Sequence, residues 1–140
     1  MEKLDALLQW YITLDRASLV RIGDFYADDA RFKDPFNDVR GLPAIGAVFE
    51  HMFETTEAPR FVIVESMAQD GRGFATWRFE FGLKGKPYTV LGATHVRFDA
   101  QGKVAEHRDY WDAAEELWQK LPLIGGPVRW LRGKFSAARR

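Results

Sequence analysis

The hydrophobic period of this 140-residue chain changes once, near Pro59, and this change restricts the possible folds more than any other feature. Before Pro59, apolar residues recur three and four positions apart, as on one face of a helix. After it, they alternate with polar residues, as on one face of a strand. Helices followed by strands predict an α+β domain in which the helices cover one face of an antiparallel sheet.

Three helices are expected before the change of period. Apolar residues have helical spacing over residues 3–15, and Ser18 can cap a second, short helix over residues 19–27. Gly41 and Pro43 precede a third apolar pattern of the same spacing, as expected at a helix N-terminus.

Four strands are expected after it, at residues 60–69, 73–83, 88–99 and 103–112. The segments DGRG, KGK and DAQG separate them and are turn signals. Strands joined by such short turns form a meander, so we expect a curved, mostly antiparallel sheet.

The length fits one domain, which we place at residues 1–121, with residues 122–140 as a C-terminal tail of the same domain or a dimer contact. The 20 basic and 20 acidic residues balance, which argues against a nucleic-acid-binding protein. The chain has no Cys, no signal-peptide pattern and no run of ~20 apolar residues. We therefore expect a soluble, cytoplasmic protein.

The tail is basic, with five Lys and Arg residues and no acid from Arg129 onward. The simplest interpretation is a short amphipathic helix that packs on the domain through Val128, Leu131 and Phe135 and leaves its cations in water. Contact with an anionic membrane or partner is the alternative; we expect no membrane contact.

Strand register decides which polar residues meet. We expect Phe98 to lie opposite Lys103 in the last hairpin, and Gly82 opposite Tyr88 in the preceding one. These registers place six residues on one face of the sheet: Arg78, Glu80, Thr94, His107, Asp109 and Trp111.

Gly92 then lies between Arg78 and Asp109 on the middle of three strands. Because glycine has no side chain, Arg78 can cross the ~9.6 Å between the outer strands and bridge Asp109 and Glu80. Such a bridge lets one carboxylate act as a base while the other keeps a proton as an acid.

A shift of one residue in the first hairpin would turn Arg78 and Glu80 to solvent. The alternate stripe of that strand, which is Trp77, Phe79 and Phe81, would then form the core. Spacing alone leaves both interpretations open.

Asp34 lies between aromatic residues and precedes Pro35, so it is either a base of raised pKa or a turn residue. The three histidines, His51, His95 and His107, are too scattered for a short metal-ligand motif, so we expect no metal and no cofactor.

The chain resembles the nuclear transport factor 2-like superfamily, in its SnoaL-like form, through the segments YADDARFKDP, VRGLPAIGAVFEHMF and RDYWD. This resemblance implies three helices and a curved sheet forming a cone around an apolar cavity, and a homodimer through the sheet. The cavity-lining residues it favours are Trp10, Tyr11, Phe32, Thr94, His107 and Trp111.

Two enzyme groups of the superfamily provide partial motif matches. Ketosteroid isomerase implies Asp34 as the general base, but Trp10, with Tyr11 one step away, occupies the position of its first oxyanion donor. Thr94 occupies the position of the second. An enolate would therefore lose much of its stabilisation.

Limonene epoxide hydrolase implies Asp109 as the base that activates water, Glu80 as the acid and Arg78 as the bridge. Phe32 and Asp34 replace the Tyr and Asn that hold the water in that family, which makes Asp34 an auxiliary base. The resemblance favours the interpretation in which these charged residues face the cavity.

We therefore expect a cofactor-independent acid–base enzyme, either epoxide-hydrolase-like or isomerase-like, that acts on a small apolar molecule. A binding module for such a molecule is the alternative. A dimeric interaction domain whose cavity is filled by its own aromatic side chains is the third possibility.

Overall fold

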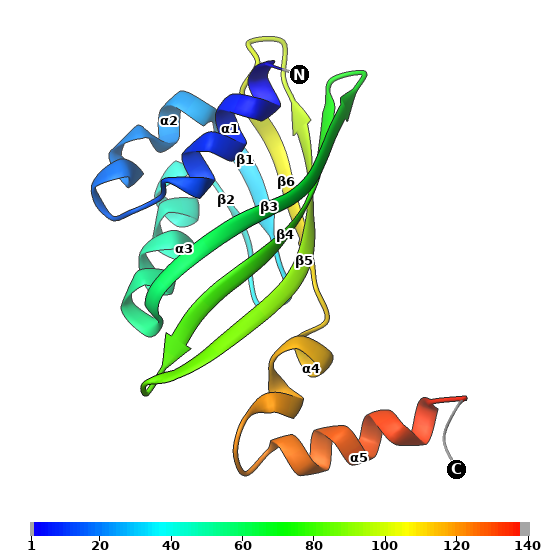
Figure 1. Ribbon diagram of the computed structural model, residues 1–140. Helices are drawn as coiled ribbons and strands as arrows, with labels where there is room; N and C mark the ends of the chain where they lie inside the picture. The colour runs from blue at the N-terminus through cyan, green and yellow to red at the C-terminus, as the bar shows by residue number, and fades with distance from the viewer. Residues whose placement is uncertain (1, 138–140) are drawn as a thin grey trace.

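The computed structural model describes residues 2–137, and it consists of a curved six-stranded sheet with helices against its concave face (Figure 1). The helical elements are α1 (Glu2–Ile12), the 3₁₀ turn η1 (Ala17–Arg21), α2 (Ile22–Phe25), α3 (Leu42–Thr55), α4 (Ala113–Glu116), the 3₁₀ turn η2 (Trp118–Lys120) and α5 (Gly125–Phe135). The strands are β1 (Tyr26–Lys33), β2 (Asp38–Arg40), β3 (Glu57–Gln69), β4 (Arg72–Leu83), β5 (Lys86–Phe98) and β6 (Val104–Tyr110). The α+β class and the order of helices before the main sheet agree with the sequence.

The sheet order is β2-β1-β6-β5-β4-β3, and every neighbouring pair is antiparallel except β1 and β6. The meander β3 to β6 corresponds to the four predicted strands. Strands β1 and β2 were not predicted, because β1 pairs with a strand some 75 residues later, as in the pair Phe32 and His107. Tyr26, predicted on the second helix, is instead the fully buried first residue of β1.

The second helix is shorter than predicted and consists of one 3₁₀ turn followed by a single α-turn. Ser18 does not cap it. Its backbone N–H instead donates to Asp15 Oδ1 at 2.7 Å, and its hydroxyl donates to the Asp15 carbonyl at 2.9 Å. Both groups are used to close the turn after α1.

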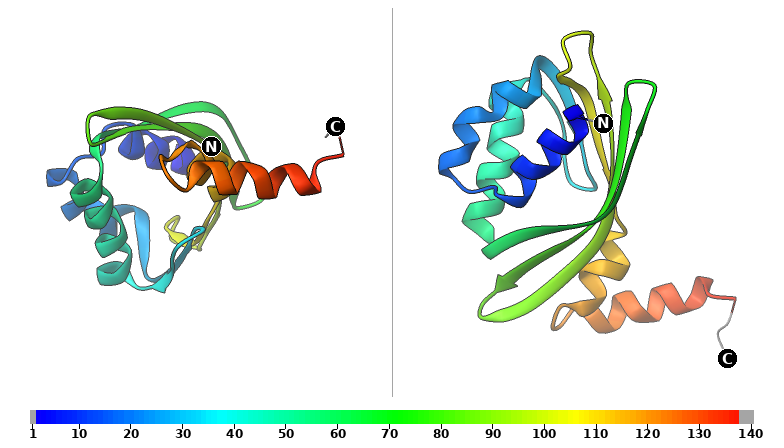
Figure 2. Two further views of the ribbon diagram at one scale, coloured as in Figure 1. Left: turned by 90° about the horizontal axis from the view of Figure 1, so that it is seen from below. Right: turned by 45° about the horizontal axis from the view of Figure 1, so that its top comes forward.

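Helices α1 and α3 cover the concave side of the sheet, and Figure 2 shows the strands curving around them. The first core cluster lies where α1 packs on the sheet and includes Leu4, Leu7, Tyr26, Ile45 and Val96. A second cluster, formed around Trp77, Phe81, Tyr88 and Val90, lies at the opposite end of β4 and β5. The two clusters divide the concave side into a closely packed end and a more open end.

The register of β4 with β5 is one residue away from the prediction, which is therefore wrong. The hairpin has a two-residue turn, Lys84-Gly85, with Leu83 opposite Lys86. Both turn residues have positive φ, 51° and 78°, as the tight turns of two-residue hairpins require. Phe81 consequently lies opposite Tyr88, and every side chain of β4 takes the opposite face from the predicted one.

The register of β5 with β6 is two residues away from the prediction, so Thr94 lies opposite Asp109. A shift of two residues leaves each side chain on its predicted face. Thr94, His107 and Asp109 therefore share the concave side, as expected.

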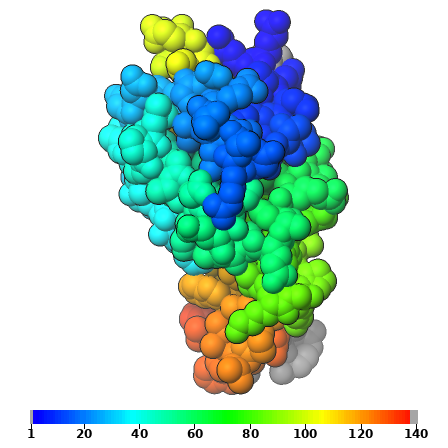
Figure 3. Space-filling model, turned by 90° about the vertical axis from the view of Figure 1, so that its left-hand side faces the viewer, coloured from blue at the N-terminus to red at the C-terminus, as the bar shows by residue number. Residues whose placement is uncertain are grey.

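The C-terminal helix does not pack on the domain as predicted. Helix α5 extends away from the sheet, and the space-filling view shows the C-terminal segment as a protrusion below the cone (Figures 1 and 3). Leu131 is 54% exposed and Phe135 is 85% exposed, so neither side chain docks. Among the described residues, no helix has the length and apolar character needed to cross a membrane.

Candidate functional site

A cavity of about 340 Å³ occupies the open end of the cone, between α3, the β1–β2 turn and the concave side of β4 and β5. It is lined by Phe32, Asp34, Phe36, Asn37, Val48, Phe49, His51, Met52, Thr55, Thr56, Phe61, Trp77, Phe79, Phe81, Leu83, Val90, Asp109, Trp111 and Leu117. Eight of these residues are aromatic, two are carboxylates, and this lining includes no Lys or Arg. Its size is that of a pocket for a small molecule.

Asp109 is the cavity carboxylate that is held by side chains of the sheet. Its Oδ1 accepts a hydrogen bond from Thr94 Oγ1 at 2.6 Å and lies 2.6 Å from His107 Nε2. The side chain is 16% exposed, whereas that of His107 is almost fully buried. Within residues 2–137, all hydrogen bonds to this carboxylate end on Oδ1.

The hydrogen bonds that link Trp77, Thr94 and Asp109 can run in only one direction, from the indole to the carboxylate. The indole Nε1 of Trp77 can only donate, and it donates to Thr94 Oγ1 at 2.8 Å. Thr94 therefore uses its own proton for Asp109. Asp109 is therefore an acceptor at Oδ1.

On the histidine side, the network continues to two buried tyrosines. His107 Nδ1 lies 2.7 Å from the hydroxyl of Tyr26 and 2.9 Å from that of Tyr11, and the two hydroxyls also hydrogen-bond to each other. Burial is the main cause that raises the pKa of both tyrosines well above the usual value of 10.0. Both hydroxyls thus keep their protons, and we assign Nδ1 of His107 as an acceptor and its Nε2–H as the donor to Asp109.

Gly92 allows this arrangement, although not in the way predicted. A Cβ atom at Gly92 would lie 2.7 Å from Cζ2 of Trp77, which faces it across the β4–β5 pair. The gap above the glycine is therefore filled by the indole of Trp77 and not by Arg78. Because the indole crosses β5 there, its Nε1 reaches Thr94.

Arg78 and Glu80 lie on the opposite, convex side of the sheet. Arg78 is paired with Glu80 at 3.4 Å, and Glu80 also pairs with Arg60 of β3. The hydrogen bond from Arg60 is the main cause that lowers the pKa of the Glu80 carboxyl. The structure does not bring this pair to Asp109, so the predicted arginine bridge is not formed.

Asp34 lines the cavity, but both of its oxygens are engaged in the turn, since Oδ2 also accepts from the Asn37 side chain at 3.2 Å. Oδ1 accepts from the backbone N–H of Phe36 at 2.8 Å, from that of Asn37 at 2.7 Å and from the Asn37 side chain at 3.0 Å. This is the turn role that Asp before Pro commonly has. Asp34 is thus both a turn residue and a wall of the cavity.

The other predicted lining residues fall into three groups: some line the cavity, some lie behind its wall, and one is outside it. Phe32 and Trp111 are at the cavity surface. Tyr11, Thr94 and His107 lie behind it, in the network of Asp109. Trp10 is elsewhere, stacked on Phe25 with its Nε1 donating to the Ser18 carbonyl.

Two members of the network were missed in the sequence. Tyr26 looked like a helix residue because its pairing partner, β6, is distant in the chain. Trp77 was recognised only as a core residue in the alternative register. The Lys-Gly pair at positions 84 and 85 was the available signal, since a two-residue turn fixes the register that turns Trp77 inward.

Among residues 2–137, no group of three or more His, Asp or Glu residues has the arrangement of a metal site. Asp34 and Asp109 are the charged groups of the cavity, and both are anionic when ionised. The lining therefore suits a neutral or cationic molecule better than an anionic one.

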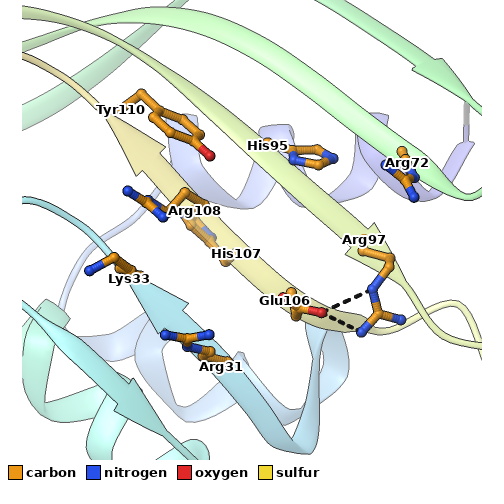
Figure 4. Close-up of a pocket in the computed structure, with 9 residues that line it drawn as sticks. All are labelled: Arg31, Lys33, Arg72, His95, Arg97, Glu106, His107, Arg108 and Tyr110. Carbon is orange, nitrogen blue, oxygen red and sulfur yellow. Dashed lines mark hydrogen bonds and ion pairs between the residues drawn. The ribbon is translucent and has the colours of Figure 1, made fainter.

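A second hollow, of about 260 Å³, lies on the convex side of the sheet (Figure 4). Its lining is Arg31, Lys33, Arg72, His95, Arg97, Glu106, His107, Arg108 and Tyr110. Arg97 pairs with Glu106 at 2.6 Å, and this pairing is the main cause that lowers the pKa of the Glu106 carboxyl. The hollow is open, charged and on the opposite side from Asp109.

The comparisons with known proteins agree on the fold. The profile of the SnoaL-like domain matches residues 7–107. The comparison with curated proteins gave no match.

Three solved structures resemble the chain at identities that support the fold alone. An NTF2-like protein of unknown function from Burkholderia pseudomallei has a TM-score of 0.73 and 18% identity, over 82% of this chain and 94% of that one. A SnoaL-like family protein from Agrobacterium tumefaciens, provisionally assigned as an isomerase, has a TM-score of 0.68 and 19% identity, over 80% of this chain and 99% of that one. A hypothetical protein of ketosteroid isomerase-like fold from Catenulispora acidiphila, in complex with trimethylamine, has a TM-score of 0.71 and 18% identity, over 92% of this chain and 96% of that one.

Proposed function

Since the chain belongs to the SnoaL-like domain family, we propose that it is a cofactor-independent enzyme that moves a proton on a small, largely apolar molecule, with Asp109 as the general base. The observation that carries this proposal is the asymmetric environment of the Asp109 carboxylate. Two donors hold Oδ1, while Oδ2 has no hydrogen bond within the described residues and belongs to a side chain that lines the cavity. A carboxylate held in this way is oriented and has one oxygen available to accept a proton.

Isomerisation fits the cavity better than epoxide hydration. Hydration by the predicted mechanism needs a base for the water and a separate acid for the epoxide oxygen, and Glu80 is on the convex side of the sheet. Isomerisation needs one base, which takes a proton from one carbon atom and returns it to another, so no proton is gained or lost overall. We therefore propose an isomerase-like proton transfer next to a carbonyl group. Because Trp10 and Thr94 replace the oxyanion donors of ketosteroid isomerase and both are engaged elsewhere, we expect weak stabilisation of the enolate and slow turnover.

Asp109→Asn tests this role. Replacing the carboxylate by a neutral amide removes the base, and turnover should fall by about 10²–10⁴-fold. A suitable assay is the incorporation of deuterium from D₂O into a panel of small apolar ketones, followed by mass spectrometry. Thermal unfolding of the variant checks that the fold is retained.

The matched control is Glu80→Gln, which removes a carboxylate from the same sheet but from its convex side. Its exchange rate should equal that of the parent. An exchange rate unchanged in Asp109→Asn, or lost equally in both variants, would contradict the assignment of the base.

A second candidate function is the binding of a small apolar amine without turnover. Its support is the combination of eight aromatic rings with two carboxylates and no Lys or Arg in the lining, because aromatic faces and carboxylates both attract cations. The structural neighbour in complex with trimethylamine has the same fold.

Calorimetric titration with trimethylamine and larger trialkylamines separates the two candidates. Binding that weakens in Asp109→Asn, without deuterium exchange into any ketone, would favour the binding module. Exchange without amine binding would favour the enzyme.

A further inference from the structure

The charge of this chain is divided between its two ends. Residues 117–140 hold six basic residues and no acid, so residues 1–116 hold the other 14 basic residues and all 20 acidic ones. The overall balance of charge therefore hides an acidic domain with a cationic C-terminal segment. Such an asymmetry points to an anionic partner for that segment.

The same segment carries an apolar stripe that is mostly exposed within residues 2–137, although Val128 is partly buried. Val128, Leu131 and Phe135 lie on one face of α5, and Ile124, the residue that precedes the helix, is four positions before Val128 and continues the stripe. Leu131 and Phe135 are more than half exposed, and Ile124 nearly so. Just before the helix, Leu123 is 97% exposed.

Cationic side chains flank this stripe. By helical spacing, Arg132 lies on one side of it and Lys134 on the other. Arg132 is paired with Glu115 at 3.6 Å, so within the described part of α5 Lys134 is the cation that faces solvent beside the stripe. Lys134 also lies over the ring of the exposed Trp130, 5.0 Å from its centroid. An apolar stripe bordered by Lys and Arg, with an exposed Trp on the same helix, is a composition found in helices that lie in a membrane interface.

The base of the helix is fixed to the domain, which leaves the stripe free. Arg129 donates to the Gln119 carbonyl, and Arg132 donates to the Gln119 side chain at 2.6 Å. Gly125 packs so closely that a Cβ there would lie 2.6 Å from that carbonyl oxygen. These contacts direct α5 away from the cone, as Figures 1 and 2 show.

Contrary to the expectation from the sequence, we propose that α5 binds the surface of an anionic membrane and attaches the domain there. The stripe enters the boundary between headgroups and acyl chains, and Lys134 stays at the level of the anionic headgroups. Exposed Leu and Phe side chains favour this surface over nucleic acid, whose phosphates offer them no apolar contact.

The test uses the full chain and extruded vesicles of phosphatidylcholine, with or without an equal part of phosphatidylglycerol. We expect co-sedimentation with the anionic vesicles, much weaker co-sedimentation with phosphatidylcholine alone, and a decrease with salt. Failure of the parent chain to bind anionic vesicles would overturn the proposal. Because the readout is binding, it is independent of any activity in the cavity.

Two variants locate the contact. Lys134→Glu changes the charge by two and should weaken binding about 30-fold, because each cation near an anionic surface contributes about fivefold. Leu131→Ser combined with Phe135→Ser removes the most exposed part of the stripe and should weaken binding at least about tenfold.

Matched controls carry the same changes on the domain. Lys3→Glu and Val20→Ser alter exposed residues of α1 and η1 and should bind as the parent does. Equal losses in controls and variants would overturn the proposal. So would a light-scattering mass showing that Leu131 and Phe135 join two copies of the chain while vesicles are not bound.

Discussion

The two faces of β4 are in contact with quite different surroundings, although their residues alternate along one strand. On the concave side, Trp77 and Phe81 are buried, and Trp77 reaches the network of Asp109. On the convex side, Arg78 and Glu80 form ion pairs that are partly exposed to water. The comparison shows that one step of register separates a residue of the candidate site from a surface ion pair.

The predicted registers of the β4–β5 and β5–β6 hairpins were both in error, but only one error changed which side chains face the cavity. The β5–β6 register differs from the predicted one by two residues, and the predicted faces are right. The β4–β5 register differs by only one, and the predicted faces are wrong. Because side chains alternate with a period of two, whether an error is odd or even matters more than its size.

Among the substitutions considered, Gly92→Ala, on the concave side of the sheet, should decrease the free energy of unfolding the most. The added methyl group collides with the indole of Trp77, and overpacking of this kind costs about 1–3 kcal/mol of the free energy of unfolding. Urea unfolding measures that cost. Leu91→Ala, at the neighbouring exposed position, should cost less.

A double-mutant cycle tests the stated cause. In a Trp77→Phe background the ring is smaller, so the alanine at position 92 should cost clearly less than in the parent. Equal costs in both backgrounds would show that the indole is not what the glycine accommodates.

The buried tyrosines predict a loss of stability at alkaline pH. Their folded-state pKa is raised, so below pH 10 both states keep the protons and stability is unaffected. Above about pH 10 the unfolded chain releases protons that the folded chain retains, and stability falls by about 1.4 kcal/mol per pH unit for each tyrosine.

Tyr11→Phe should therefore make the pH dependence of the free energy of unfolding shallower by the contribution of one tyrosine. Urea unfolding between about pH 9 and pH 12 measures the slope. An identical slope in parent and variant would mean that Tyr11 ionises in the folded state as readily as in water.

The smallest effect is expected on the convex side. Arg78→Gln and Glu80→Gln should leave the melting temperature and any activity close to the parent values, because solvent screens these ion pairs. They also test the homodimer through the sheet that the family resemblance predicts. A change in molar mass by light scattering in either variant would place these residues at such an interface.

Much of the concave site was accessible from the sequence. Thr94, His107 and Asp109 were placed on one face, and Phe32, Asp34 and Trp111 were predicted near the cavity, where the structure has them. The positions of Trp77, Tyr26 and Arg78 were not. Each depends on a pairing between strands, either the β4–β5 register or the parallel pairing of β1 with β6.

For the C-terminal tail, too, some properties could be predicted from the sequence and others could not. Its amphipathic pattern and its positive charge were plain in the sequence, whereas its packing on the domain was wrong, because Leu131 and Phe135 are exposed. A pattern shows that a helix has an apolar face, but only the arrangement of the other elements decides whether a surface is available to cover it.

The sequence by itself determined the α+β class, the order of its elements and the presence of acids among aromatic residues, because these follow from local periodicity and composition. The tertiary structure decided which acid is held in the cavity. Asp109 is oriented by Thr94, His107 and the indole that crosses Gly92, and these contacts join strands whose alignment depends on a two-residue turn. Such contacts are non-local, and an error of one residue in that alignment reverses them.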